Sequence, residues 1–595
     1  MAAPQSLNHD SSSKLAPSPK AVPQLADSTD ADASRHPAAI EPKPDPEYVT
    51  GVKLAIIVAT VGFASFLILL DLMIVSTAIP KITDEFHSLG DVGWYASAYQ
   101  FGSASPQPLT GKIYKYFNTK WTFLVFFAVF EIGSVICGAA NSSAVFIAGR
   151  FIAGFGGAGV ATGTIAIVSS SAPLEKRAGL LGFTLGCEFQ HHSWYNWISL
   201  VLTGKLTVNL LGIVLGPLIG GAFTSYVTWR WCFYINLPIG AVAALSIFVL
   251  RVPEPTIKPK ALSLLPRLHH HLDLVGFVLF APAILQLLLA LQFGGQVYPW
   301  NSSQVIGLFV GAVATLAVWF LWNRHRGEDA MMPRALIRRK NVLAAALYNA
   351  SQTSALYAAI YYLPIYFQAV KGASAVLSGV YILPLILFQL VCAGASGGVV
   401  QKIGYTIPIT LFASVFLSTG TGLLSLLQPS TSTARWVGFQ VLVGVGFGSG
   451  LQMPIIAVQA AMDGEELASG IAFMVFSQAI GPAIANTLYN VIFLASLPTQ
   501  IRRFAPHADA QAIIDAGASG FRSIVSPEDL NGVEVAYSNS LGRIYYLAVA
   551  FAALCGIASW GMGWNDLRKK EVDVTEAKIN STGADGRVEE VKEAV

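Results

Sequence analysis

Stretches of about twenty apolar residues recur along most of the chain, and this recurrence restricts the possible folds more than any other feature. A helix needs roughly 20 such residues to cross the ~30 Å hydrocarbon core of a bilayer. Only 12% of the residues are charged, against about 25% in an ordinary soluble domain. We therefore predict an all-α polytopic membrane protein with fourteen transmembrane helices, and we exclude a soluble enzyme and a nucleic-acid binder. The predicted spans are 53–79, 92–110, 121–140, 144–168, 206–225, 231–250, 274–293, 304–322, 342–368, 376–400, 406–427, 436–458, 470–495 and 544–564.

Lysine and arginine are distributed unequally between the two sides of these spans. Nineteen lie in the short loops and the tail on the side of the N-terminus, and four lie in the short loops of the opposite side. Because cytoplasmic loops carry an excess of Lys and Arg, both termini are expected to be cytoplasmic. The sequons at Asn141 and Asn301 then face outward, and we predict glycosylation there. The other predicted regions are a disordered cytoplasmic tail (1–48), a cytoplasmic loop (251–273), a long external loop (496–543) and a second cytoplasmic tail (565–595).

An internal repeat divides the chain into two halves. Gly111 and Gly398 begin similar segments 287 residues apart, and Gly156 and Gly446 lie in similar glycine-rich runs 290 residues apart. Transporters are often built from duplicated bundles. The predicted architecture is an N-terminal six-helix bundle (49–250), two linker helices (274–322) and a C-terminal six-helix bundle (342–564).

One segment breaks the repeat. Gly216 and Gly481 match at an offset of only 265 residues, so the first half holds about 25 extra residues before Gly216. The anomalous insert is 188–211, which differs in composition from its surroundings. It is either an amphipathic segment on the membrane surface or a translated intron, and we favour the intron.

Three ionisable residues lie inside the predicted spans of the first bundle: Asp71, Glu131 and Arg150. Such residues are costly in lipid unless paired, and they are functional by default. Their predicted depths are similar, so we predict that they couple transport to proton movement. In the alternative interpretation Asp71 and Arg150 form a static pair that holds helices together, and Glu131 only bonds a neighbouring backbone group.

Two further sets of residues are candidates for function. The run that contains Gly216, Pro217, Gly220 and Gly221 removes a backbone hydrogen bond and lets another helix approach closely. A polar and aromatic set in the second bundle could line a cavity for a bulky, partly apolar ligand, although such residues are more often contacts between helices. That set comprises Asn349, Gln352, Tyr357, Tyr361, Tyr362 and Gln389. The run His269–His271 lies in a basic loop without a second ligand cluster, so no metal is predicted.

The chain resembles the fourteen-helix drug:proton antiporter branch of the major facilitator superfamily, and within it the fungal pumps that export toxins and other secondary metabolites. The resemblance covers residues 48 to 565. Its motifs are LLDLMIVSTAIPKITDEFHSLGDVGWYASAYQ from Leu69, GKIYKYFNTK from Gly111, FEIGSVICGAANSSAVFIAGRFIAGFGGAG from Phe130, GPLIGGAF from Gly216 and WRWCFYINLPIG from Trp229.

The resemblance assigns roles to several of these residues. It places the family's acidic span-one motif on Asp71, its span-four arginine on Arg150, and its antiporter motif on the run from Gly216 to Gly221. The chain departs from the family at Lys115, where many members have an aspartate, and at the insert, which separates the antiporter motif from Gly182 and Gly186.

The expected function is proton-coupled export of a small amphipathic organic compound, such as a toxin, secondary metabolite or drug, across the plasma membrane. The alternative is a vacuolar or uptake transporter of basic amino acids or iron chelates. The expected partners are the small-molecule substrate and the lipid bilayer. We expect no enzymatic activity, no nucleic-acid partner and no cofactor besides the proton gradient, and we expect the protein to act as a monomer.

Overall fold

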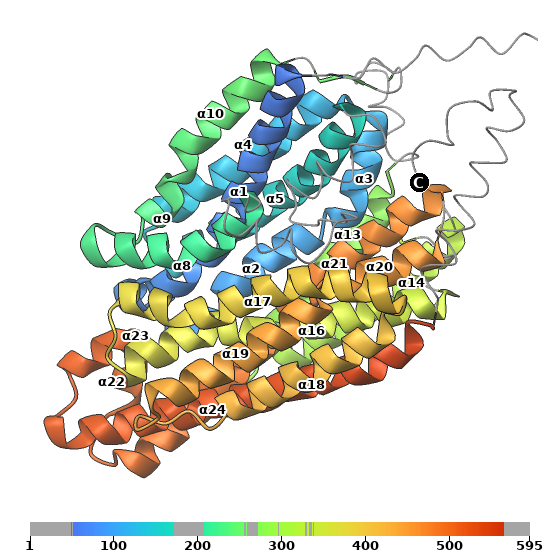
Figure 1. Ribbon diagram of the computed structural model, residues 1–595. Coiled ribbons are helices and arrows are strands. Elements are labelled where there is room, and N and C mark those ends of the chain that lie inside the picture. The colour runs from blue at the N-terminus through green and yellow to red at the C-terminus, as the bar shows by residue number, and fades with distance from the viewer. Residues whose placement is uncertain are drawn as a thin grey trace, which may run out of the picture. The chain divides into compact units, whose positions relative to one another are not determined.

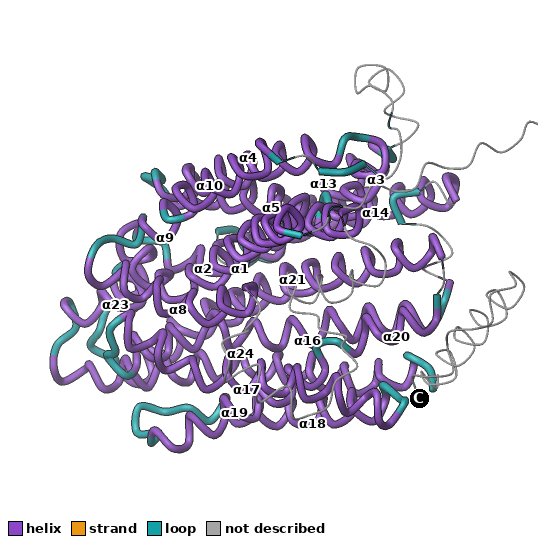
Figure 2. The backbone as a smooth tube through the Cα atoms, turned by 45° about the horizontal axis from the view of Figure 1, so that its top comes forward, coloured by secondary structure: helices purple, strands orange, loops and turns teal. Residues whose placement is uncertain are grey.

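The computed structural model describes residues 49, 51–171, 208–250, 252–254, 258, 272–295, 297–327, 330–332, 336, 338–462 and 464–564. Helices account for nearly all of this part of the chain, and short loops join them (Figure 2). Both tails, the run His269–His271 and nearly all of the predicted insert 188–211 lie outside the described residues.

The helices follow the order predicted from the sequence. The first half contains α1 (Val52–Phe86), α2 (Val92–Ala104), α3 (Gln107–Tyr116), α4 (Thr119–Gly138), α5 (Ser143–Ser171), α8 (Val208–Tyr226), α9 (Trp231–Tyr234) and α10 (Asn236–Val249), with the short turn η1 (Leu89–Asp91) between α1 and α2. The middle contains α13 (Leu274–Phe293) and α14 (Ser303–Arg326). The second half contains α16 (Lys340–Ile365), η4 (Tyr366–Val370), α17 (Ala375–Ile403), α18 (Ile407–Leu424), α19 (Thr433–Gly450), α20 (Met453–Ala461), α21 (Gly464–Phe504), α22 (Ala510–Asp515), α23 (Gly517–Gly520), η5 (Phe521–Ser523) and α24 (Pro527–Gly561).

Eleven helices in the described residues are long and apolar enough to cross a membrane. Helices cover most of the predicted spans 92–110 and 342–368 and the described part of 206–225, but none of these three spans is among the eleven. The helix α2 has only 13 residues, fewer than a full crossing needs. The helix α16 carries a polar run around Asn349 that lowers its hydropathy. The structure therefore confirms an all-helical membrane protein, while the number fourteen stays a prediction.

Local sequence signals explain several helix ends. Ser374 accepts a hydrogen bond from the backbone N–H of Leu377 at the start of α17, and Ser526 accepts one from Asp529 at the start of α24. Such caps satisfy amide groups that have no partner within the helix. Gly404 ends α17 with a φ of 80°, a backbone conformation that glycine adopts without strain.

The two halves of the chain contain the same pattern of helix contacts. In the first half α1 packs against α8, α5 packs against α2 and α4, and α4 packs against α10. In the second half α16 packs against α21, α19 packs against α17 and α18, and α18 packs against α24. The halves meet where α8 contacts α17 and α2 contacts α21 (Figure 1).

Corresponding glycines allow the close approach of corresponding helices. A Cβ atom on Gly154 would collide with the carbonyl oxygen of Tyr99 in α2, and one on Gly444 would collide with that of Leu385 in α17. A Cβ atom on Gly156 would likewise collide with the backbone of α4, and one on Gly446 would collide with the backbone of α18. The glycine-rich runs found in the sequence are therefore points at which α5 and α19 approach their neighbouring helices closely.

Much of the predicted external loop 496–543 is helical. The helix α21 continues to Phe504, and α24 begins at Pro527. Three short elements lie between them: α22, α23 and η5. The sequence analysis did not find these three elements because they have only six, four and three residues, far fewer than the roughly 20 of an apolar span. The segment is anchored on the first half through Asp84 in α1, which accepts hydrogen bonds from the backbone N–H and the hydroxyl of Ser519.

The two middle helices are joined to each other by a buried acid that the sequence analysis did not select. Asp273 caps α13 by accepting the N–H of Gly276 at 2.9 Å. It also accepts the indole N–H of Trp322 in α14 at 2.8 Å and the backbone N–H of Met331 at 2.7 Å. Its side chain is 2% exposed, so these donors satisfy a carboxyl group that would otherwise be costly to bury.

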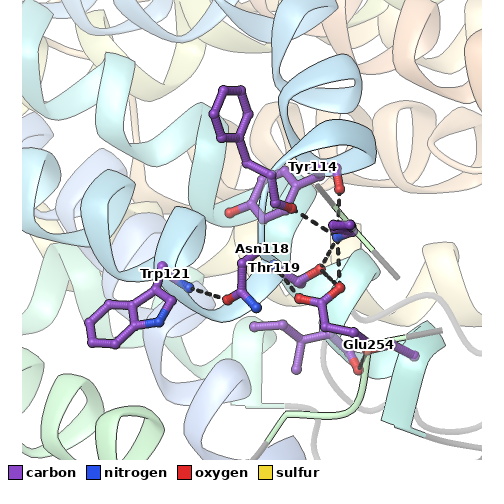
Figure 3. A network of polar contacts seen from close by, with 9 residues as sticks. Tyr114, Asn118, Thr119, Trp121 and Glu254 are labelled. Carbon is purple, nitrogen blue, oxygen red and sulfur yellow. Dashed lines mark hydrogen bonds and ion pairs between the residues drawn. The ribbon is translucent and has the colours of Figure 1, made fainter. Parts of the chain in front are cut away.

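A polar network fixes the described part of the predicted cytoplasmic loop 251–273. Glu254 accepts the backbone N–H of Thr119 at the start of α4, and its carboxylate pairs with Lys258 at 2.7 Å (Figure 3). The Lys258 ammonium also donates to the carbonyl oxygens of Tyr114 and Phe117 at 2.9 Å each. The negative charge thus lies at a helix N-terminus and the positive charge near a helix C-terminus, where each is stabilised.

Candidate functional site

An ion pair lies inside the first bundle. Arg150 in α5 and Asp71 in α1 approach to 2.6 Å, and both side chains are 0% exposed. A buried ion pair loses much of its Coulomb attraction to the cost of desolvation, so it is weak evidence for stability. In the described residues the buried charged side chains are these two and Asp273. The structure thus brings into contact two of the three ionisable residues that the sequence analysis grouped together.

Hydrogen bonds connect the ion pair to polar groups on neighbouring helices. Asn236 in α10 donates to Asp71 at 3.3 Å and to the hydroxyl of Ser134 in α4 at 3.1 Å. The Nε of Arg150 donates to the carbonyl oxygen of Tyr95 in α2 at 3.3 Å. Four helices are therefore connected to the helix that carries Arg150. One guanidinium nitrogen, Nη2, is buried and has no hydrogen-bond partner among the described residues.

Aromatic residues cover the guanidinium group on the side of the second bundle. The carbon at the centre of the Arg150 guanidinium group lies 4.3 Å from the centre of the Tyr99 ring, a favourable cation–π distance. Tyr99 in turn lies within electrostatic range of Tyr357 and Tyr361 in α16. The hydroxyls of Tyr99 and Tyr361 are buried and have no partner among the described residues. The ion pair therefore faces unpaired hydroxyl groups from both bundles.

Glu131, the third predicted member of the trio, lies apart from this pair. Both of its carboxyl oxygens are buried without a hydrogen-bond partner among the described residues. Its carboxyl group lies against Gly240 in α10, where a Cβ atom would collide with Oε1. The structure therefore brings together Asp71 and Arg150 but does not place Glu131 in contact with either.

The predicted antiporter motif lies where three helices meet. Gly216 and Gly220 in α8 face Met73 and Ile74 in α1, two and three residues beyond Asp71. On the next position of α8, Gly221 faces the backbone of α17. In α17, Gly379 allows the same close approach, because a Cβ atom there would collide with the carbonyl oxygen of Pro217 in α8. The close approach predicted from these glycines is confirmed, and it joins the helix of Asp71 to the second bundle.

The residues predicted to line a substrate cavity lie in different surroundings. Asn349 donates to the carbonyl oxygen of Met474 in α21 at 2.8 Å, and Gln352 donates to that of Phe447 in α19 at 2.8 Å. These bonds join helices within the second bundle. Tyr357, by contrast, accepts a hydrogen bond at 2.6 Å from Gln100 in α2, across the interface of the bundles. Gln389 is buried, and its side-chain oxygen has no partner among the described residues.

Sequence reasoning missed three residues of the site. Asn236 lies in the WRWCFYINLPIG motif, and Tyr99 and Gln100 lie in the stretch that begins at Leu69. Asparagine, glutamine and tyrosine occur in many membrane helices as contacts between helices, so their presence alone carries little signal. Their membership of motifs that also contain Asp71 or follow Arg150 was the signal that could have identified them.

Comparisons with known proteins agree with this architecture. A family model described as Major Facilitator Superfamily matches residues 61–486. The chain is 47% identical to MFS-type transporter pigP of Monascus ruber, over 91% of each chain. It is 45% identical to MFS-type transporter calB of Penicillium decumbens, over 90% of this chain and 93% of the relative. It is 44% identical to Efflux pump mlcE of Penicillium citrinum, over 88% of this chain and 92% of the relative.

Solved structures are similar in fold at low sequence identity. A bacterial homologue of the human lysosomal transporter Spinster, in an inward-facing and occupied conformation, superposes with a TM-score of 0.54 at 15% identity, over 86% of this chain and 98% of that one. A D-xylose–proton symporter gives a TM-score of 0.53 at 12% identity, over 86% and 99%. At these identities the similarity is evidence for the fold alone.

Proposed function

Because the chain belongs to the Major Facilitator Superfamily, and is therefore a membrane transporter and not an enzyme, we propose that it exports a small amphipathic organic compound in exchange for protons. The proposal includes fourteen membrane spans, cytoplasmic termini and a location in the plasma membrane. The family and the relatives support transport, and one of the relatives reported above is named an efflux pump. Proton coupling and the substrate class are inferred from the geometry of the site.

The observation that carries the proposal is the buried pair of Asp71 and Arg150, 2.6 Å apart, with the guanidinium group beside the ring of Tyr99. A proton added to Asp71 removes the charge that Arg150 balances. The guanidinium group then gains from new acceptors, since its Nη2 has no hydrogen-bond partner among the described residues. Proton uptake at Asp71 therefore changes which contacts between the bundles are favourable, which is the coupling that an exchanger requires.

Because α1, α8 and α17 are closely packed, protonation of Asp71 in α1 can alter how these helices move against one another. Gly220 holds α8 against the turn of α1 that follows Asp71, and Gly221 holds α8 against α17. Small residues at such contacts allow helices to slide or rock without large side chains obstructing them. We assign to this junction the role of transmitting the state of Asp71 to the interface of the bundles.

The nature of the second bundle supports a neutral or weakly ionised substrate. In the described residues no charged side chain is buried in α16 to α24, so this bundle offers no counter-ion to a strongly charged ligand. It presents tyrosine hydroxyls and amides such as Tyr361 and Gln389. Shape, aromatic surfaces and a few hydrogen bonds are the usual basis for recognising a partly apolar molecule.

The proposal is tested by expressing the chain in yeast that lacks its own drug pumps and measuring retention of a panel of lipid-soluble metabolites. At least one compound should be retained less in expressing cells, because the inward proton gradient drives it out. A protonophore should restore its retention to the level of cells with an empty vector. If export continues when the gradient is abolished, or if expressing cells accumulate more of the compound, proton-driven export is contradicted.

A further inference from the structure

A groove of about 500 Å³ lies between α4 and α10. It is wide enough for a small molecule, since ligand sites usually measure about 300–1,000 Å³. Two of its wall residues, Ile132 and Val135, are 54% and 40% exposed, so the groove opens on the surface of the bundle. Its lining consists of Leu124, Phe127, Ala128, Glu131, Ile132, Val135, Ile136, Leu237, Gly240, Ala241 and Ala244.

Glu131 is the one polar side chain in this lining. Its two carboxyl oxygens are buried and have no hydrogen-bond partner among the described residues. Gly240 provides the space for the carboxyl group, because a Cβ atom there would collide with Oε1. A carboxyl group without a partner in an apolar setting is costly, and a ligand that supplies the missing hydrogen bond would relieve that cost.

The depth of Glu131 decides which molecule fits. It lies near the middle of α4, seven residues before the end of the helix at Gly138, which is about 10 Å along the axis. The polar head groups of phospholipids remain at the surface of the ~30 Å hydrocarbon core, so they do not reach this depth. A small lipid-soluble molecule whose hydroxyl group lies within an apolar framework does reach it, and it needs a polar partner there.

We propose that the groove between α4 and α10 is a binding site for a lipid-soluble molecule with a hydroxyl group, which enters from the bilayer and hydrogen-bonds to Glu131. This inference rests on the proposed function in one respect, namely that the occupant belongs to the class of compound that the protein exports. The site is separate from the interface of the bundles, because its lining belongs to α4 and α10, whereas the main contacts between the bundles are made by α1, α2 and α8 of the first half. It collects the compound from the membrane before export.

The test uses the full chain in lipid vesicles and a pair of photoreactive probes. One probe is a long-chain secondary alcohol that carries a diazirine next to its hydroxyl group, and the other is the same molecule without the hydroxyl. Peptides labelled after illumination are identified by mass spectrometry. We expect the alcohol to label α4 and α10 about fivefold more than the hydrocarbon does, which is the difference that one net hydrogen bond provides.

Three variants and a matched control decide the outcome. Ala128→Phe fills the groove and Glu131→Leu removes the polar group, and each should reduce the preference for the alcohol to about that of the hydrocarbon. Glu131→Gln retains a donor and an acceptor and should keep most of the preference. The control is Val125→Phe, because Val125 is 62% exposed on the same helix but does not line the groove. Equal labelling by the two probes in the wild type, or unchanged labelling in Ala128→Phe, would overturn the inference.

Failure of this inference can be distinguished from failure of the proposed function. Asp71→Asn should lose gradient-driven export and keep the labelling of the groove. If the groove is not labelled while export still follows the proton gradient, only the binding site is refuted. If the groove is labelled but the compound identified by retention does not compete with the alcohol, the assignment of the occupant is refuted.

Discussion

Each bundle carries a long polar side chain at the equivalent position of its equivalent helix, α5 in the first bundle and α19 in the second. Only the side chain in the first bundle is charged. Gln440 in α19 lies 290 residues after Arg150, the offset that also separates Gly156 from Gly446. Arg150 donates to the carbonyl oxygen of Tyr95 at 3.3 Å, and Gln440 donates to that of Tyr381 at 2.9 Å. Both side chains are 0% exposed. The hydrogen bond to the neighbouring helix is thus common to both halves.

Comparing Arg150 with Gln440 distinguishes two roles of this position, contact between helices and coupling of transport to protons. A neutral amide satisfies the helix contact in the second bundle, so the contact does not require an arginine. The first bundle additionally contains the ion pair of Arg150 with Asp71, which a neutral amide could not form. The account therefore assigns proton coupling to the first bundle and assigns helix packing and substrate contacts to the second.

The largest expected effect comes from breaking the ion pair on one side. Arg150→Met leaves Asp71 buried without its counter-charge and should lower the free energy of unfolding by about 3–5 kcal/mol. The measurement is thermal unfolding of the detergent-solubilised protein, followed by size-exclusion chromatography. The double variant Asp71→Asn with Arg150→Gln copies the neutral arrangement of the second bundle and should recover most of the loss. Equal stability of Arg150→Met and the wild type would contradict the buried charge pair.

A smaller effect is expected from the corresponding glycines. Gly154→Ala and Gly444→Ala each place a methyl group against a backbone carbonyl of the neighbouring helix, and overpacking of this kind costs about 1–3 kcal/mol. The control is Gly397→Ala, since a Cβ atom there has no neighbour within 4 Å. If only one of the two variants is destabilised in the same thermal assay, the two glycines do not have equivalent packing roles, although their sequences match.

The smallest effect is expected at Gln440. Gln440→Leu removes one hydrogen bond between helices, which should cost about 1 kcal/mol, and it should leave the dependence of export on the proton gradient unchanged. Thermal unfolding and the retention assay in yeast provide the two readouts. A loss of gradient-dependent export in this variant would place part of the coupling machinery in the second bundle.

The sequence predicted the features that the bilayer itself imposes. Helix positions follow from the length of apolar stretches, and Asp71 and Arg150 were conspicuous because charges are rare in such stretches. The short helices between Phe504 and Pro527 were not predicted because their six, four and three residues are too few to appear as apolar spans. Asn236 was missed because an amide in a membrane helix is common, and only the fold shows that it contacts Asp71.

Glu131 shows a different limit. Its charge and depth grouped it with Asp71 and Arg150, although depth along a helix does not determine which way the side chain faces. The structure turns it toward α10 and the apolar groove. Whether it also takes part in proton coupling stays a prediction, which the labelling and export assays on Glu131→Gln examine together.

The central claim is that Asp71 takes up the proton that drives export. The most direct measurement is the initial rate of export of the retained compound from inverted vesicles, determined over a series of imposed pH gradients for the wild type, Asp71→Asn and Gln440→Leu. The account predicts that the rate rises with the gradient in the wild type and in Gln440→Leu, and that it does not respond to the gradient in Asp71→Asn, although equal amounts of folded protein are present. An unchanged gradient dependence in Asp71→Asn would contradict the claim and would make the buried pair a purely structural contact.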